Sequence, residues 1–167
     1  MKDIIHTILE KLFTKLNLVF LKKLLSIYNI YMNNIKKSDL KFGNYKEVEA
    51  LKTIQNKFSS CLKKVRDNYF VFDYSCDNCY VELKSRRNTH DKYPDTMVGK
   101  NKIDFAEKSD RPCYFCFSFT DGLYYWKYNK DDIENGNVEF RVSGRNDRGK
   151  EEYKDYAFIK INILEKI

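Results

Sequence analysis

The first third of the chain has the apolar spacing of α-helices. From Ile4 to Tyr28, apolar residues recur every three or four positions, which predicts two helices, or one bent helix, over about residues 3–35. A polar segment follows and ends in Gly43-Asn44, a dipeptide typical of a break between helices. A further amphipathic helix is predicted over about residues 45–58.

From residue 69 onward the period changes to that of β-strands. Six segments rich in aromatic and β-branched residues are bounded by turn residues, and they cover residues 69–75, 80–85, 114–119, 123–128, 137–142 and 156–163. Asp77-Asn78 has the composition of a hairpin turn. Residues 86–112 are polar at first and are predicted to be helical from about Lys100 to Lys108. This order of elements predicts one α/β domain with a mixed β-sheet flanked by helices.

Length and charge narrow the class of protein. A chain of 167 residues with 43% hydrophobic residues suits one folded domain and excludes a disordered chain. Residues 1–67 hold 14 Lys or Arg and 6 Asp or Glu, a net charge of +8, and the remainder holds 17 and 18, a net charge of −1. The basic N-terminal part could therefore contact a nucleic acid backbone, or it could form an ordinary solvated helix face.

The sequence also predicts where the protein resides. No segment approaches the roughly 20 apolar residues that span a bilayer, and no apolar segment precedes a small-residue cleavage site. Five cysteines without an export signal are typical of reduced thiols. We therefore expect an intracellular protein of the cytoplasm or nucleus, neither secreted nor transmembrane.

Four of the cysteines form two C-x-x-C pairs, Cys76 with Cys79 and Cys113 with Cys116. Four such thiolates can bind a structural Zn²⁺. On a regular strand, however, Cys113 and Cys116 would point to opposite faces of the sheet. Their aromatic neighbours also favour buried apolar thiols over zinc ligands.

The chemistry of the chain centres on the predicted hairpin. If Asp77-Asn78 is a two-residue turn, Asp73 lies directly opposite Glu82, and Lys84 lies on the same face of the sheet. Two carboxylates this close repel each other unless a cation lies between them, and oxygen ligands suit Mg²⁺. Such a metal could polarise a scissile phosphate while Lys84 stabilises or orients the attacking hydroxide. The arrangement predicts a metal-dependent nuclease.

Other charged residues could join this site. Glu47 lies in the apolar stripe of its predicted helix, within about 40° of Leu51, so it could act as an auxiliary acid. Arg86 and Arg87 follow the Glu82 strand and could hold a phosphate. Lys102, on the later helix, could point toward the same region and contact the substrate.

These residues resemble the PD-(D/E)XK nuclease superfamily. The similarity is carried by Asp73, then eight residues, then Glu82-Leu83-Lys84, with a preceding helix that begins Gly43-Asn44-Tyr45-Lys46-Glu47 and a following helix that contains Lys102. Phe72 stands where the family signature has Pro. The segment from Glu82 to Ile103 is also similar to uncharacterised proteins of large DNA viruses.

The resemblance implies a restriction-endonuclease-like fold. Its αβββαβ core would cover about residues 43–128, with extra C-terminal strands, and residues 1–42 would form a basic helical extension packed on the domain at 43–167. It also implies Mg²⁺ or Mn²⁺ held by Asp73 and Glu82, with Lys84 assisting the water and Glu47 joining the site.

We therefore expect a DNA endonuclease. The alternative is a non-catalytic nucleic-acid-binding module, with or without zinc, that uses the basic N-terminal part and the aromatic sheet; a protein scaffold is a third reading. The sequence leaves RNA as a substrate, the mode of cutting and a homodimer open, and it predicts no membrane partner.

Overall fold

The computed structural model describes residues 2–67, 70–145 and 152–167. Its elements follow one another in the order helix, strands, helix, strands. They are α1 (Lys2–Lys57), β1 (Lys63–Lys64), β2 (Tyr74–Cys76), β3 (Cys79–Ser85), η1 (His90–Lys92), β4 (Asp95–Gly99), α2 (Lys100–Lys108), β5 (Cys113–Phe119), β6 (Gly122–Lys127), α3 (Lys130–Glu134), β7 (Val138–Arg145), β8 (Glu152–Lys160), η2 (Ile161–Ile163) and β9 (Glu165–Lys166).

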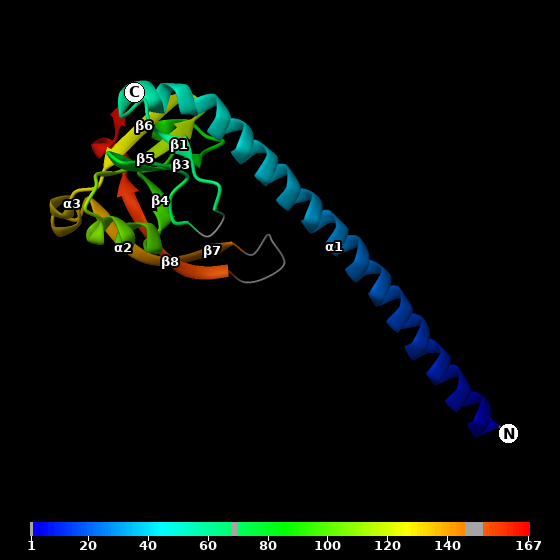
Figure 1. The fold of residues 1–167 in the computed structure, drawn as a ribbon. Coiled ribbons are helices and arrows are strands. Elements are labelled where there is room, and N and C mark those ends of the chain that lie inside the picture. Colours follow the sequence, from blue (N-terminus) through cyan, green and yellow to red (C-terminus); the bar gives the residue numbers. More distant parts are fainter. Residues whose placement is uncertain (1, 68–69, 146–151) are drawn as a thin grey trace.

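The strands form two sheets (Figure 1). The larger sheet has the order β1-β2-β3-β5-β6-β9, in which β3 and β5 are parallel and the other neighbours are antiparallel. The smaller sheet has the antiparallel order β4-β8-β7. Helix α1, the β1–β2–β3 meander, α2 and β5 reproduce the predicted αβββαβ order, which confirms the restriction-endonuclease-like fold class.

Two apolar clusters fill the two faces of the larger sheet. On one face, Ile54 near the end of α1 packs with Val81 and Leu83 of β3. On the other face, Ile103 of α2 packs with Phe115 of β5 and Ile159 of β8. Because side chains alternate along a strand, Glu82 between Val81 and Leu83 faces the second layer, where α2 and the smaller sheet lie.

One prediction about the helices is wrong. Instead of a break at Gly43-Asn44, α1 continues from Lys2 to Lys57. The penalty for one glycine inside a helix is only about 1 kcal/mol, and neighbours hold this segment on both sides. The Tyr74 hydroxyl donates to the carbonyl of Glu47 over 2.7 Å, and Arg87 lies over the ring of Phe42.

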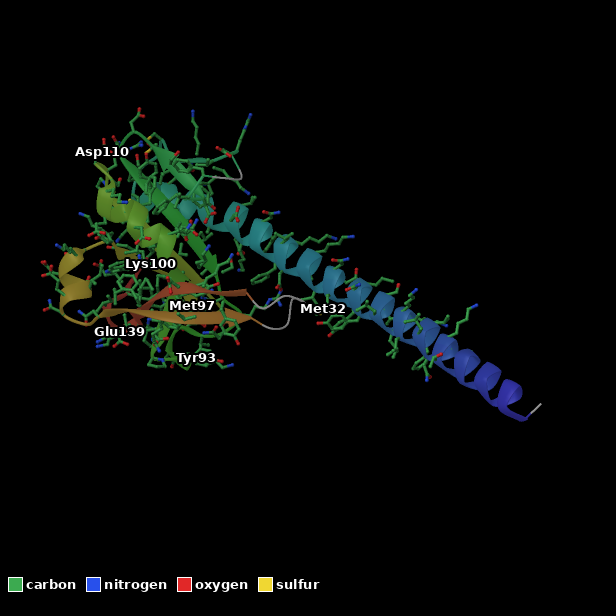
Figure 2. The ribbon with its side chains drawn as sticks, turned by 90° about the horizontal axis from the view of Figure 1, so that it is seen from below. Met32, Tyr93, Met97, Lys100, Asp110 and Glu139 are labelled. Carbon is green, nitrogen blue, oxygen red and sulfur yellow. The ribbon has the colours of Figure 1, made fainter. Side chains whose placement is uncertain are left out.

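The N-terminal part of α1 extends away from the domain (Figures 1 and 2). Apolar side chains from Leu16 to Tyr31 are exposed along it, so this stretch does not pack on the described core as we expected for residues 1–42. Within the described residues, no helix combines the length and the apolar character needed to cross a membrane.

Gly43 gives a direct test of the continuous helix. A Cβ atom added at this position would meet nothing within 4 Å, and alanine is favoured over glycine inside a helix by about 1 kcal/mol. We expect Gly43→Ala to raise the free energy of unfolding by about 0.5–1 kcal/mol in urea titrations. If the chain had a turn at this point, the same substitution would lower it.

The strand predictions hold for β3, β5 and β6 within one or two residues, and the helix predicted at 100–108 is α2. The strand predicted at 69–75 is shorter: β2 begins at Tyr74, and Tyr69 lies outside the described residues. The strand predicted at 156–163 is β8, which ends at Lys160. Strand β4 is missed, and with β7 and β8 it forms a separate sheet instead of extending the predicted single one.

Candidate active site

The β2–β3 hairpin has the predicted register. Cys76 pairs with Cys79 and Tyr74 pairs with Val81 across the Asp77-Asn78 turn. Continuing this register by one residue places Asp73 opposite Glu82. The Asp73 side chain bonds to the neighbouring strand: its Oδ2 atom accepts a hydrogen bond from the backbone N–H of Leu83 at 2.8 Å. Asp73, Glu82 and Lys84 therefore come together at the start of β2.

Glu82 is completely buried between two lysines. Its Oε1 atom lies 2.5 Å from Nζ of Lys84, and its Oε2 atom accepts a hydrogen bond from Nζ of Lys102 at 3.0 Å. Lys102 also donates to the carbonyl of Val71. One carboxylate thus joins β3 to α2 and to the segment before β2.

Burial and neighbouring charges together shift the pKa values of Glu82 and Lys84. It raises the pKa of the Glu82 carboxyl above its usual range; Asp73 adds to this effect, and Lys84 and Lys102 oppose it. Burial on its own would lower the pKa of Lys84, but the carboxylates of Glu82 and Asp73 outweigh it and raise that pKa. Lys84 in this structure is therefore an ammonium group beside two carboxyl groups.

One buried oxygen of the cluster is held by an ion pair instead of an aligned hydrogen bond. Glu82 Oε1 contacts the Lys84 ammonium at 2.5 Å, yet no group in the described residues is aligned to donate a hydrogen bond to this buried atom. A buried carboxylate oxygen in this state can accept a cation.

A cavity of about 450 Å³ opens beside the cluster. Asp73, Leu83 and Lys84 line it from the hairpin, and Glu47 lines it from α1. Glu47 does not join the other two carboxyl groups directly, because its Oε2 atom pairs with Nζ of Lys64 at 2.5 Å. The site therefore has two adjacent carboxyl groups, with a third across the cavity.

Arg86 and Arg87 also line this cavity, in different ways. Arg86 turns toward β4, where its Nε donates to Oγ1 of Thr96 at 3.1 Å and its Nη2 donates to the carbonyl of Met97. Burial lowers the pKa of Arg86 to about 10. Arg87 is more exposed and reaches α1, with Nη2 3.2 Å from Oδ1 of Asp39. Arg86 is thus anchored to β4, whereas Arg87 is accessible at the edge of the cavity.

On α1, three residues that line the cavity were not expected at the site: Asp39, Phe42 and Gly43. They were missed because a helix break was expected there. A signal was present, since Asp39, Gly43 and Glu47 follow one another at four-residue intervals and thus share one face of a continuous helix.

The four cysteines considered as zinc ligands do not come together. Cys113 packs in the cluster beneath α2, whereas Cys76, Cys79 and Cys116 belong to the cluster beneath α1. This separation confirms that Cys113 and Cys116 point to opposite faces of β5. In the described parts of the chain, no group of three or more His, Cys, Asp or Glu residues is arranged to hold a metal ion.

Comparison with family models identifies a family that covers most of the chain. Residues 37–165 match the family described as "Phage putative PDDEXK endonuclease". The match spans the hairpin, α2 and both sheets, and it begins within α1, two residues before Asp39. No curated protein and no solved structure matches the chain significantly.

Proposed function

Because the chain belongs to the phage PDDEXK endonuclease family, we propose that it is a DNA endonuclease that uses a divalent cation held by Asp73 and Glu82. The family match supports a nuclease acting on nucleic acid. The observation that carries the finer proposal is the cluster of Asp73, Glu82 and Lys84 beside a cavity that also holds two arginines.

The residues fit Mg²⁺ better than a metal ion that takes all of its ligands from the protein. Mg²⁺ retains several waters and is commonly bound through one or two carboxylates together with substrate phosphates. Asp73 and Glu82 supply two such groups, and the Glu82 Oε1 atom contacts the Lys84 ammonium at 2.5 Å. Mn²⁺ accepts the same oxygen ligands. When bound, the metal would polarise the phosphate and acidify a water molecule.

Lys84 is proposed to be the cation that faces the reacting phosphate. Its side chain lines the cavity and is about one third exposed, and its Nζ atom contacts Glu82. From there the ammonium can hold the attacking water by a hydrogen bond and stabilise the charge that develops on the phosphate oxygens.

The surrounding residues are proposed to position the substrate and the carboxylates. Arg87 at the rim can bind a neighbouring phosphate in a bidentate manner, with Arg86 behind it. Lys102 was expected to contact substrate, but its bonds to Glu82 and Val71 favour a positioning role for the carboxylate. Glu47 remains an auxiliary acid, held at the cavity by Lys64.

The proposal is tested by incubating the purified protein with supercoiled, linear and branched DNA, with Mg²⁺ and with EDTA. We expect cleavage in Mg²⁺, including nicking or linearisation of the supercoiled form, and no cleavage in EDTA. Salt-sensitive binding without turnover under any condition would instead support the non-catalytic binding module. RNA in parallel reactions tests the choice of substrate.

We further propose that α1 associates with α1 of a second copy. Eleven apolar residues between Leu16 and Tyr31 are each at least 46% exposed. Leu18, Leu21, Leu25 and Tyr28 follow the alternating three- and four-residue spacing of a coiled coil. The other exposed apolar side chains lie around the remaining faces of the helix, so an assembly of two or more copies would bury more of this surface than the seam alone.

Sedimentation velocity checks this association. The wild type should sediment as an assembly of at least two copies, and Leu21→Glu combined with Leu25→Glu should release the monomer. Ser26→Glu places a charge away from this seam and should leave the assembly intact. A wild type that is monomeric at tens of micromolar, or one that binds anionic vesicles instead of itself, would contradict the proposal.

A further inference from the structure

A group of three thiols lies at the turn of the β2–β3 hairpin, away from the carboxylate cluster. Cys76 ends β2, Cys79 begins β3, and the two are paired directly across the Asp77-Asn78 turn. Cys61 comes from the turn that follows α1 and is exposed. These cysteines include one of the C-x-x-C pairs that the proposed function leaves without a role.

Hydrogen bonds connect the turn after α1 to this hairpin. The Ser59 hydroxyl lies 3.0 Å from Sγ of Cys61, and Nδ2 of Asn78 donates to the Ser59 hydroxyl over 3.4 Å. The carbonyl of Cys76 accepts a hydrogen bond from Nη1 of Arg111 at 2.7 Å. These bonds hold the turn that carries Cys61 against the hairpin turn between Cys76 and Cys79.

The environment separates the three thiols by reactivity. Burial on its own would raise the pKa of Cys76, but hydrogen bonds from the Cys61 thiol, the Ser59 hydroxyl and the backbone N–H groups of Asn78 and Cys79 lower it to about 7. Burial raises the pKa of Cys79 to about 12, and the neighbouring Cys76 adds to this shift. Cys76 is therefore the nucleophile, and the buried Cys79 stays protonated.

We infer that Cys76 and Cys61 form an oxidant-sensitive thiol pair that closes to a disulfide on reaction with a hydroperoxide. The Cys76 thiolate attacks the peroxide, so that an S–O bond forms, the O–O bond breaks, and the alkoxide or hydroxide leaves. The Cys61 thiolate then attacks the Cys76 sulfur. The S–S bond forms as the S–O bond breaks, and the hydroxide that leaves takes a proton to become water.

This closure would tie the end of α1 to β2, three residues from Asp73. Cys61 is the resolving thiol because it is exposed and adjoins Cys76, whereas Cys79 is almost fully buried. The charged and titratable groups around Cys76 are Cys61 from the turn after α1, Cys79 from β3 and Arg111 from the segment before β5.

The test treats the full chain with hydrogen peroxide and maps its peptides without reduction. The wild type should lose two hydrogen atoms by mass and yield a Cys61–Cys76 linked peptide, which dithiothreitol should reverse. Cys61→Ser should stop at a sulfenic acid on Cys76, trapped by dimedone. Cys79→Ser should still form the disulfide, and Cys76→Ser should form none.

Alkylation provides a second readout that needs no variant. Iodoacetamide should modify Cys76 of the folded chain with a rate that is half-maximal near pH 7, the pKa of about 7 set by its hydrogen bonds, and near about pH 8.5 in urea. Equal alkylation rates in the folded and unfolded chain, or a disulfide that joins any other pair, would overturn the inference. Neither readout depends on nuclease activity.

Discussion

Lys84→Ala should reduce Mg²⁺-dependent DNA cleavage by about 10²–10³-fold. The substitution removes the ammonium that contacts Glu82 and lines the cavity, while leaving both carboxylates and the arginines in place. Initial rates on supercoiled DNA, measured over a range of Mg²⁺ concentrations, would separate a loss of turnover from a loss of metal binding.

Two controls make the result specific to that position. Lys108→Ala removes an exposed lysine from the last turn of α2 and should cleave like the wild type. Lys84→Arg keeps the charge and tests whether activity depends on the shape of the ammonium. If Lys84→Ala keeps the wild-type rate while its circular dichroism is unchanged, the proposed role of Lys84 is wrong.

Glu82→Ala should have the largest effect on stability, in addition to abolishing cleavage. The repulsion between two carboxylates alone would predict that this loss costs little. The structure reverses that expectation, because Glu82 is completely buried and pairs with both Lys84 and Lys102. Removing it leaves the Lys102 ammonium without its carboxylate partner and leaves Lys84 with Asp73 alone. We expect a loss of about 3 kcal/mol, at the lower end for such pairs since Lys84 reaches solvent.

Urea unfolding at neutral pH measures this loss. A double substitution, Glu82→Ala with Lys102→Met, removes the cation that lost its partner and should recover part of the stability. If the single substitution leaves the unfolding midpoint unchanged, the two ion pairs contribute nothing to the fold. If the double substitution is no more stable than the single one, the loss of Glu82 does not make the Lys102 ammonium destabilising.

The hairpin could be predicted because short-range rules determine it. A two-residue turn fixes the register of its strands, so Asp73, Glu82 and Lys84 could be placed together from the sequence alone. Lys102 was also expected to point toward this region, and it contacts Glu82. These residues lie within a few positions of a turn or helix that local composition identifies.

What the sequence could not show depends on contacts between distant segments. Strand β4 has five residues and exists through its pairing with β8, about sixty residues later in the chain. The continuity of α1 at Gly43 depends on contacts from β2 and from the end of β3. The complete burial of Glu82 likewise results from packing of α2 against β3, which no local pattern encodes.

The proposed active site depends on the ability of Asp73 and Glu82 to bind a divalent cation. Mn²⁺ titration followed by electron paramagnetic resonance measures that binding directly, and Asp73→Asn removes a ligand charge while keeping the bond from the Leu83 N–H. We predict one Mn²⁺ per wild-type chain, displaced by Mg²⁺, and at least tenfold weaker binding by Asp73→Asn at an unchanged melting temperature. Equal Mn²⁺ affinity in the two proteins would contradict the metal site.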